Sequence, residues 1–141
     1  MGHYLLDTNH TSPLVTLQHP LRQRIEAARV EGHDFSLAAP VLAEALFGFL
    51  SLPRAVANRE IWEQLRHALR VFAVDEQDAT EAALLRIFLR RRGRQLGTID
   101  ALIAVIALRY EFILLTTDSD FLAVPHLRVE NWLESLPEGG R

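Results

Sequence analysis

The sequence contains no cysteine and no lysine, and each absence excludes a class of chemistry. Without cysteine, disulfide bonds, thiolate zinc ligands and cysteine nucleophiles are excluded. Because all 15 residues counted as lysine or arginine are arginine, a lysine Schiff base and the lysine of a phosphate-binding P-loop are excluded as well. No apolar run approaches the roughly 18 residues needed to span a bilayer, and the first residues lack the pattern of a secretion signal. We therefore expect a cytoplasmic protein that does not enter a membrane.

The remaining composition is typical of a folded domain. A length of 141 residues suits one domain, and 49% apolar residues with only 7 glycines and 6 prolines predict a substantial core. The net charge of −3 gives no overall positive field that would attract a polyanion, so any basic patch must be local. We expect one domain over residues 1–141, with a loose tail at residues 137–141.

Short apolar runs alternate with helical patterns along the chain. Strands are predicted at residues 4–6, 35–37, 71–74, 113–115 and 127–129, and helices at residues 21–30, 41–50, 55–69, 75–90 and 101–108. Asp75 and Asp78 have the spacing of a helix cap, and Thr98 is predicted to cap the last helix. That last helix is apolar on every side and should be buried, whereas the polar segment 7–13 is predicted as a turn. This alternation predicts an α/β sandwich with a mainly parallel sheet.

Two of the predicted strands lead into an aspartate. Asp7 follows the run YLL, and Asp118 follows ILLTT. Such aspartates often form turns, but the carboxyl ends of parallel strands are also where open α/β sheets bind ligands. Glu44 and Asp100 lie in two apolar helices, where the alternatives are an exposed helix face for Glu44 and a favourable first-turn charge for Asp100. We predict that these four acids meet at one edge of the sheet.

Carboxylates gathered in this way require a cation, because two like charges about 4 Å apart repel by about 4 kcal/mol at an effective dielectric near 20. A ligand set of hard oxygens without sulfur favours Mg²⁺ or Mn²⁺ over zinc. Such ions generate a hydroxide nucleophile near neutral pH and stabilise a leaving oxygen, which is the chemistry of nucleases. Thr8, Asn9 and Thr116 flank the acids and are predicted to orient ligands or water.

A dense basic stretch precedes the last helix and comprises Arg90, Arg91, Arg92 and Arg94, with Arg86 one turn earlier. One interpretation is a solvated helix end, where cations interact favourably with the helix dipole. The other is a clamp for nucleic-acid phosphates, which would contact the backbone because few aromatic residues accompany the arginines. The six histidines show no zinc-binding spacing, and only His10 lies near the predicted site.

Taken in order, the motifs LLDTN, VLAEALFG, GTIDALIAVIAL and TTDSDF, followed by VPHLRVENW, resemble the PIN-domain ribonucleases, specifically the VapC-type toxins of bacterial toxin–antitoxin systems. The resemblance spans residues 4–132. It implies a three-layer α/β/α sandwich and an endoribonuclease that uses Mg²⁺, with Mn²⁺ as a substitute. It also implies a homodimer and inhibition by a VapB-like antitoxin, through which alone the protein would meet DNA.

By position, the family's acidic quartet is matched by Asp7, Glu44, Asp100 and Asp118. The resemblance makes Asp7, Asp100 and Asp118 metal ligands and makes Thr8 and Thr116 supporting hydroxyls. The segment TTDSD leaves Asp118 and Asp120 as alternatives for the fourth acid, and we rank Asp118 first.

Two other interpretations stay open. The chain is alternatively a PIN-like nuclease that processes RNA outside a toxin pair, or a module that keeps the fold and only binds a partner. The loss of an acid would have favoured the second alternative, and none is missing. Phe47, Phe49 and Trp62 are predicted to pack in the core rather than to form a dimer or antitoxin surface.

Overall fold

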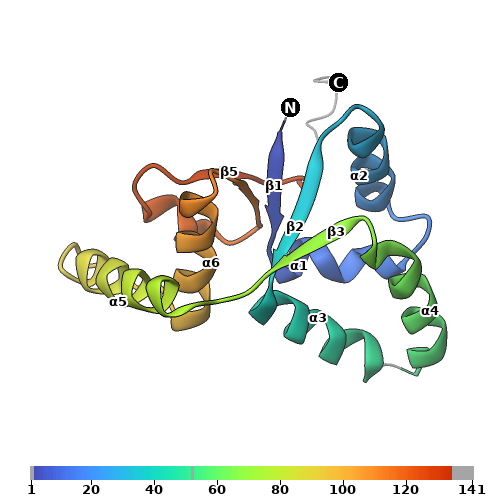
Figure 1. Cartoon of the computed structure of the whole chain (residues 1–141), viewed down its shortest axis with the longest axis horizontal. Helices are drawn as coiled ribbons and strands as arrows, with labels where there is room; N and C mark the ends of the chain where they lie inside the picture. Colours follow the sequence, from blue (N-terminus) through green and yellow to red (C-terminus); the bar gives the residue numbers. More distant parts are fainter. Residues whose placement is uncertain (1, 52, 135–141) are drawn as a thin grey trace.

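A parallel sheet of five strands forms the centre of the chain in the computed structural model, which describes residues 2–51 and 53–134 (Figure 1). The strands are β1 (His3–Leu6), β2 (Asp34–Ala38), β3 (Leu69–Phe72), β4 (Ile113–Leu115) and β5 (Arg128–Glu130). Their order across the sheet is β3-β2-β1-β4-β5, and every pairing is parallel. In this register Tyr4 lies between Phe35 of β2 and Ile113 of β4. The predicted tail at residues 137–141 lies outside the described residues.

Helices cover both faces of the sheet. They are α1 (Thr8–Thr11), α2 (Pro20–Val30), α3 (Ala39–Leu50), α4 (Ala55–Arg66), α5 (Glu76–Arg90) and α6 (Thr98–Arg109), with 3₁₀ turns η1 (Ser12–Val15) and η2 (Ser119–Ala123). The chain moves outward from β1 to β3 and then returns past β1 to β4. Because parallel crossovers are right-handed, this return places α5 and α6 on the face opposite α1 to α4, as Figure 1 shows. The predicted α/β/α sandwich with a parallel sheet is confirmed.

The core lies on both sides of β1 and β4. Leu5, Leu6, Leu114 and Leu115 have no exposed surface, as expected of central strands covered on two faces. On the α5–α6 side, six residues of α6 are buried, which confirms the prediction of a buried apolar helix. Helix α6 runs antiparallel to α5, whose predicted cap is present as a capping box between Asp75 and Asp78.

Several element boundaries differ from the sequence-based prediction. The polar segment after Asp7 forms α1 and η1 instead of a simple turn. Helix α4 ends at Arg66, and Leu69 already belongs to β3, which spans residues 69–72 rather than 71–74. Thr98 is not the cap of α6, because Gly97 takes that position and Thr98 is the first helical residue.

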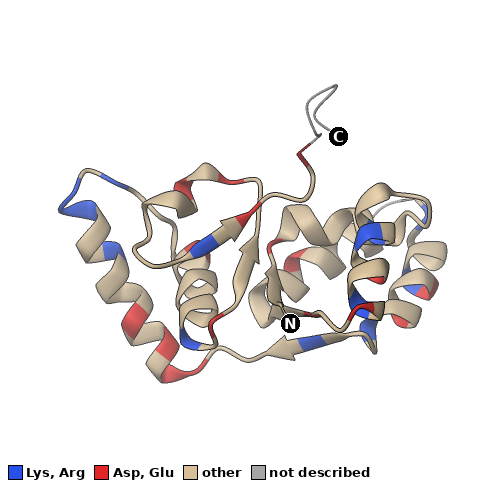
Figure 2. Ribbon diagram, turned by 90° about the horizontal axis from the view of Figure 1, so that it is seen from above, with Lys and Arg blue, Asp and Glu red and all other residues tan. Residues whose placement is uncertain are grey.

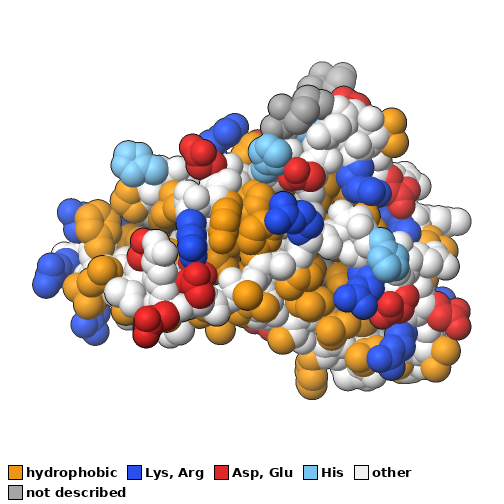
Figure 3. Space-filling model, viewed as in Figure 1, with side chains coloured by type: hydrophobic (Ala, Val, Ile, Leu, Met, Phe, Trp, Pro, Cys, Tyr) orange, Lys and Arg blue, Asp and Glu red, His pale blue; other side chains and the backbone are white. Residues whose placement is uncertain are grey.

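An apolar patch lies over α3 and α4 (Figure 3). Phe49 and Trp62 are buried there as predicted, but Phe47 is 76% exposed and does not belong to the core. Leu42, Leu46 and Val71 line a pocket beside Trp62 on the same surface. Within the described residues, no helix is long and apolar enough to cross a membrane.

Candidate active site

The strand order of the sheet reverses at β1, and the candidate site lies there. Strands β1 and β4 are neighbours, although the chain between them passes through β2 and β3. Asp7 directly follows β1, and its backbone N–H donates to the carbonyl of Leu115, the last residue of β4 (3.0 Å). In open parallel sheets the carboxyl edge at such a reversal is the usual ligand site. The two predicted strand-end positions are therefore brought together.

Asp7 is buried, with 7% of the residue exposed, and its carboxylate is held by three donors. Oδ1 accepts from the Thr8 backbone N–H (2.9 Å), and Oδ2 accepts from the Thr116 hydroxyl (2.7 Å) and from Asn9 Nδ2 (3.3 Å). A carboxylate offers about four lone-pair positions, so one position on Oδ1 remains available. This arrangement fixes the direction in which Asp7 meets a ligand.

Thr116 connects the end of β4 to the same network. Its hydroxyl is buried, donates to Asp7, and accepts from the Asp118 backbone N–H (3.0 Å) and from Asn9 Nδ2 (3.3 Å). These bonds use the full capacity of the hydroxyl. Thr116 thus sets the position of Asp7 and also the start of the segment that carries Asp118.

Glu44 lies on α3 and is exposed, as one of its two interpretations from the sequence had it. Its Oε2 accepts a hydrogen bond from the Thr8 hydroxyl (3.1 Å). Thr8 is the first residue of α1 and directly follows Asp7, so this bond turns the Glu44 carboxylate toward the β1 end of the sheet.

Asp100 lies in the first turn of α6, and its pKa is raised to about 6. The main cause is burial, and the negative charges of Asp7, Asp118, Glu44 and Asp120 raise the pKa further. The other three predicted acids and the alternative Asp120 therefore all lie near enough to Asp100 to affect it. Asp118 affects Asp100 more than Asp120 does, and its Oδ1 also accepts from the Asp120 backbone N–H (2.9 Å).

The donor set suits a hard divalent cation, because it consists of carboxylate and hydroxyl oxygens in a strongly negative environment. Within residues 2–51 and 53–134, no three acidic or histidine side chains lie close enough together to hold a metal ion as they stand. Binding would therefore require the carboxylates to draw together around the ion. Burial of Asp100 and, to a smaller extent, the charges of the other acids raise its pKa, and a bound cation would offset both effects.

From the sequence, one residue of the network, His10, was identified only as lying near the predicted site. His10 is fully buried on α1, where its Nδ1 lies 2.7 Å from Asn9 Oδ1 and its Nε2 accepts from the Trp132 backbone N–H (3.0 Å). Its spacing of three residues from Asp7 was the only available signal. The sequence held no signal for Trp132, because the group that bonds to His10 is its backbone N–H and not its side chain.

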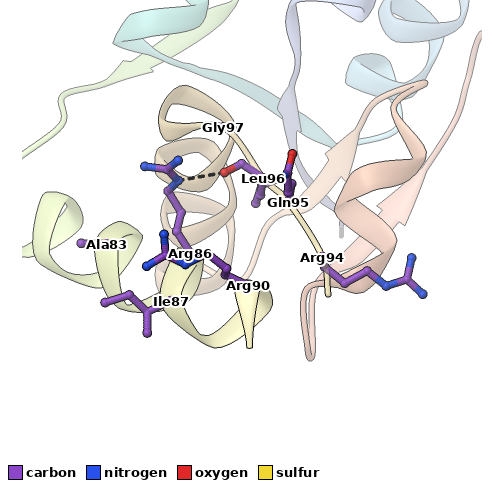
Figure 4. Close-up of a pocket in the computed structure, with 8 residues that line it drawn as sticks. All are labelled: Ala83, Arg86, Ile87, Arg90, Arg94, Gln95, Leu96 and Gly97. Carbon is purple, nitrogen blue, oxygen red and sulfur yellow. Dashed lines mark hydrogen bonds between the residues drawn. The ribbon is translucent and has the colours of Figure 1, made fainter. Parts of the chain in front are cut away.

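The predicted arginine cluster lies at one tip of the molecule, where α5 ends (Figure 2). Arg86, Arg90 and Arg94 line an open pocket of about 470 Å³ (Figure 4). Arg86 donates to the Leu96 carbonyl (2.8 Å) and to the Thr98 hydroxyl (3.1 Å), and so ties α5 to the start of α6, two residues before Asp100.

The other arginines of the cluster are arranged differently. Arg94 extends away from Arg86 (Figure 4). Arg92 packs over the Phe88 ring (3.6 Å to its centroid) and donates to the Phe88 carbonyl (3.2 Å). Arg90 and Arg91 are exposed at the end of α5. The guanidinium groups therefore do not converge on one point.

The comparisons with known proteins agree with this fold. The PIN domain family matches residues 4–127. Ribonuclease VapC4 of Mycobacterium tuberculosis is 30% identical over 108 residues, which are 75% of this chain and 83% of that protein. The structure of VapBC2 from Rickettsia felis, bound to a promoter DNA fragment, has a TM-score of 0.79 at 23% identity. The match covers 92% of this chain and 98% of the Rickettsia felis chain. DNA-bound VapBC from Salmonella typhimurium has a TM-score of 0.78 at 24% identity, with 94% and 99% covered. The chain therefore belongs to the PIN-domain family and, within it, to the VapC proteins.

Proposed function

We propose that the protein is an Mg²⁺-dependent endoribonuclease and the toxin of a toxin–antitoxin pair. The observation that carries this proposal is the placement of Asp7, Asp118 and Glu44 around the partly buried Asp100, near enough to raise its pKa, at the switch point of a parallel sheet. Membership of the VapC proteins supports it, because the relative from Mycobacterium tuberculosis is named a ribonuclease. Burial of like charges is unfavourable without a cation, so the cluster is best explained by a ligand that offsets it.

In the proposed site, Asp7, Asp100 and Asp118 hold the metal, and Glu44 completes the acidic set. Bound Mg²⁺ supplies an activated water and stabilises the leaving oxygen of the phosphodiester. The chain's own part is to orient the carboxylates: Thr116 and Asn9 fix Asp7 Oδ2, the Thr8 backbone N–H fixes Oδ1, and the Thr8 hydroxyl holds Glu44. Asp120 is the alternative to Asp118 as the fourth acid. Mn²⁺ is expected to replace Mg²⁺, since both ions prefer oxygen ligands.

RNA is the proposed substrate, and the arginine cluster is its proposed phosphate contact. Arg90, Arg91 and Arg94 project from the end of α5, which leads through the Arg86 bonds to the start of α6 and so to Asp100. Exposed guanidinium groups bind phosphate oxygens without reading bases. Arg92 belongs to the same predicted set, but its packing on Phe88 reduces its freedom to reach a phosphate.

The proposed partners are a VapB-like antitoxin and a second copy of the chain, with DNA reached only through the antitoxin. Support for the antitoxin comes from the two structural relatives named above, which are both VapBC complexes bound to DNA. The exposed Phe47 and the apolar surface around it give a physical reason to expect a protein contact. We assign the protein to the cytoplasm, where RNA and an antitoxin are both present.

The test is cleavage of end-labelled structured RNAs by antitoxin-free protein in Mg²⁺, in Mn²⁺ and in chelator. Asp7→Asn preserves the shape of the side chain but removes the charge, so we expect it to abolish cleavage without unfolding the protein. Glu60→Gln, which removes an exposed charge on α4, is the matched control and should cleave like the unmodified protein. Full activity of Asp7→Asn, or cleavage in chelator, would refute the mechanism.

The arginine contact has its own test, the salt dependence of RNA binding. Replacing both Arg90 and Arg94 with alanine should weaken binding and lower the slope of log K against log salt by about 1.4, or about 0.7 per lost phosphate contact on single strands. Arg92→Ala should change the slope less. An unchanged slope in the double variant would identify these residues as an ordinary solvated helix end.

A further inference from the structure

His10 is a buried polar residue that the proposed reaction does not use directly. Its side chain has no exposed surface, and both ring nitrogens are hydrogen-bonded. It lies between two segments that are far apart in sequence: Asn9 at the site and Trp132 beyond β5. A buried imidazole with two specific partners fixes the orientation of both.

The partners determine which nitrogen carries the proton. The Trp132 backbone N–H can only donate, so Nε2 must be the acceptor. In the neutral ring the proton is then on Nδ1, which donates to Asn9 Oδ1 (2.7 Å). Burial and the positive charge of Arg24 lower the pKa of His10 to about 4, which keeps the ring neutral near pH 7.

The orientation of the Asn9 amide follows from this tautomer. Its oxygen accepts from His10 and from the Thr117 backbone N–H (3.2 Å), so its NH₂ group must face the opposite way. On that side lie Asp7 Oδ2 and the Thr116 hydroxyl, each 3.3 Å from Nδ2. Reversal of the amide would place its NH₂ against two donors and its oxygen against a carboxylate.

The segment that supplies the Trp132 N–H is itself firmly held. The Trp132 ring packs against Tyr4 (4.9 Å between centroids) and Phe35 (5.7 Å), and the Arg24 guanidinium lies 4.0 Å from its centre. Tyr4 and Phe35 are paired residues of β1 and β2. The hydrogen bond to His10 therefore originates from a rigid part of the molecule.

We infer that His10 is a positioning residue: the bond from the Trp132 backbone to Nε2 makes Nδ1 the donor, and the Nδ1–H bond to Asn9 orients the amide that holds Asp7. The inference rests on the proposed function in so far as Asp7 binds a metal ion. The Thr117 N–H provides a second restraint on Asn9, so the loss of His10 should weaken the site without destroying it.

Two substitutions separate the two bonds of His10. In His10→Asn, the amide nitrogen sits near the place of Nδ1 and retains the donor to Asn9, while the acceptor for Trp132 is lost. In His10→Gln, the longer side chain retains an acceptor near the place of Nε2 and loses the donor to Asn9. Both variants remove the ring and should lower the melting temperature similarly, and His67→Gln, at the exposed end of α4, is the control.

The first measurement is made on the metal-free full chain by NMR. The two side-chain amide protons of Asn9, assigned by their absence in Asn9→Ala, should be resolved and slow to exchange in the unmodified protein and in His10→Asn. In His10→Gln they should shift and exchange faster. Unchanged Asn9 signals in His10→Gln would overturn the inference, as would equal disturbance in both variants, which indicates a merely structural role.

The second measurement is Mn²⁺ binding by calorimetry. Groups that orient metal ligands typically change affinity by about 10- to 100-fold, and His10 acts one bond further out, so we expect about a 3- to 10-fold loss in His10→Gln and less than about 2-fold in His10→Asn. If Mn²⁺ does not bind the unmodified protein, the proposed function fails while the NMR result still decides the role of His10. If Mn²⁺ binds all variants equally, the role of His10 is refuted and the proposed function stands.

Discussion

At the scale of single residues, Asp100 is the acid of the site whose ionisation is made unfavourable by its surroundings. Its carboxyl is partly buried and has four other acids around it, without an arginine among the causes of its shifted pKa. Without a bound cation, the protein is therefore less stable than the same fold with an uncharged side chain in place of Asp100. Stability and ligand binding are therefore opposed at this residue.

The pKa of Asp100 predicts how the metal-free protein responds to pH. Its folded-state value of about 6 lies above the ordinary 3.8, so between these values the folded chain keeps a proton that the unfolded chain has lost. Stability from this group therefore falls as pH rises from about 4 to about 6 and stays lower above. Because the carboxyl is partly solvated, we expect Asp100→Asn to stabilise the protein by about 1 kcal/mol at pH 7.5.

Urea unfolding in chelator at pH 7.5 and pH 4.5 checks this prediction. The gain of Asp100→Asn should shrink at the lower pH, where the native carboxyl is already neutral. Glu60→Gln, on the exposed face of α4, should show no such pH-dependent gain. A variant less stable than the unmodified protein at pH 7.5 would contradict the repulsion described here.

The acidic residues could be predicted from the sequence, but their hydrogen-bond partners only in part. Asp7 and Asp118 follow apolar strands, and parallel topology brings such positions together. Thr116 and Asn9 were predicted as neighbours of the acids in sequence. The role of His10 depends on a backbone N–H at Trp132, 122 residues away, and no local pattern records a contact of this kind.

At the scale of secondary-structure elements, the pairing of α5 with α6 is fixed at both ends. At one end Arg86 bonds to Leu96 and Thr98. At the other end Arg109, in the last turn of α6, donates to Asp75 (2.9 Å) and Asp78 (3.0 Å), and these bonds raise the pKa of its guanidinium. The start of α6, which carries Asp100, is thus held by contacts along the whole pair.

Asp78 is the residue of this pair that is best suited to a test. It is 1% exposed, and its Oδ2 accepts from the Asp75 backbone N–H (3.0 Å) within the capping box. Asp78→Ala removes this bond and the contact with Arg109, so we expect a loss of about 1 to 2 kcal/mol in urea unfolding. Glu81→Ala, on the exposed face of the same helix, should stay within about 0.5 kcal/mol of the unmodified protein. Equal effects of the two substitutions would show that the cap contributes nothing.

Element boundaries differed from the prediction where tertiary contacts or side-chain bonds override a periodic pattern. Leu65 and Leu69 have helical spacing, but Leu69 pairs with Phe35 and joins the sheet. The four residues of α1 are weak helix formers. Their helix is held by Asp7, which caps Thr8, and by the Thr11 hydroxyl, which donates to the Asp7 carbonyl (2.9 Å). Side-chain hydrogen bonds of this kind do not depend on the spacing of apolar residues, so hydrophobic periodicity could not predict this helix.

At the scale of the whole molecule, the site is assembled from both ends of the described chain. β1 leads to Asp7, β4 leads to Thr116 and Asp118, and the segment after β5 returns to contact α1 through His10. Trp132 packs on the strands beneath this contact. The integrity of the site therefore depends on how well the last described segment is anchored.

Trp132→Ala tests this anchor. The ring is partly buried, so we expect a loss of about 2 kcal/mol, below the 3 to 5 kcal/mol typical of a fully buried aromatic residue. Urea unfolding followed by circular dichroism measures the loss. Leu122→Ala, at a residue that is 70% exposed, is the control and should have little effect. No loss in Trp132→Ala would mean that the segment beyond β5 adds nothing to the fold.

The long separation between Asp7 and its hydroxyl partner also has a consequence for synthesis of the protein. The bond from Thr116 to Asp7 joins residues 109 positions apart. On the ribosome, the first strand emerges long before the residues that complete its carboxylate cluster exist. A nascent chain of this topology holds Asp7 without Thr116 or Asp118, so the proposed nuclease cannot act on RNA until its fourth strand has been translated and has joined the sheet.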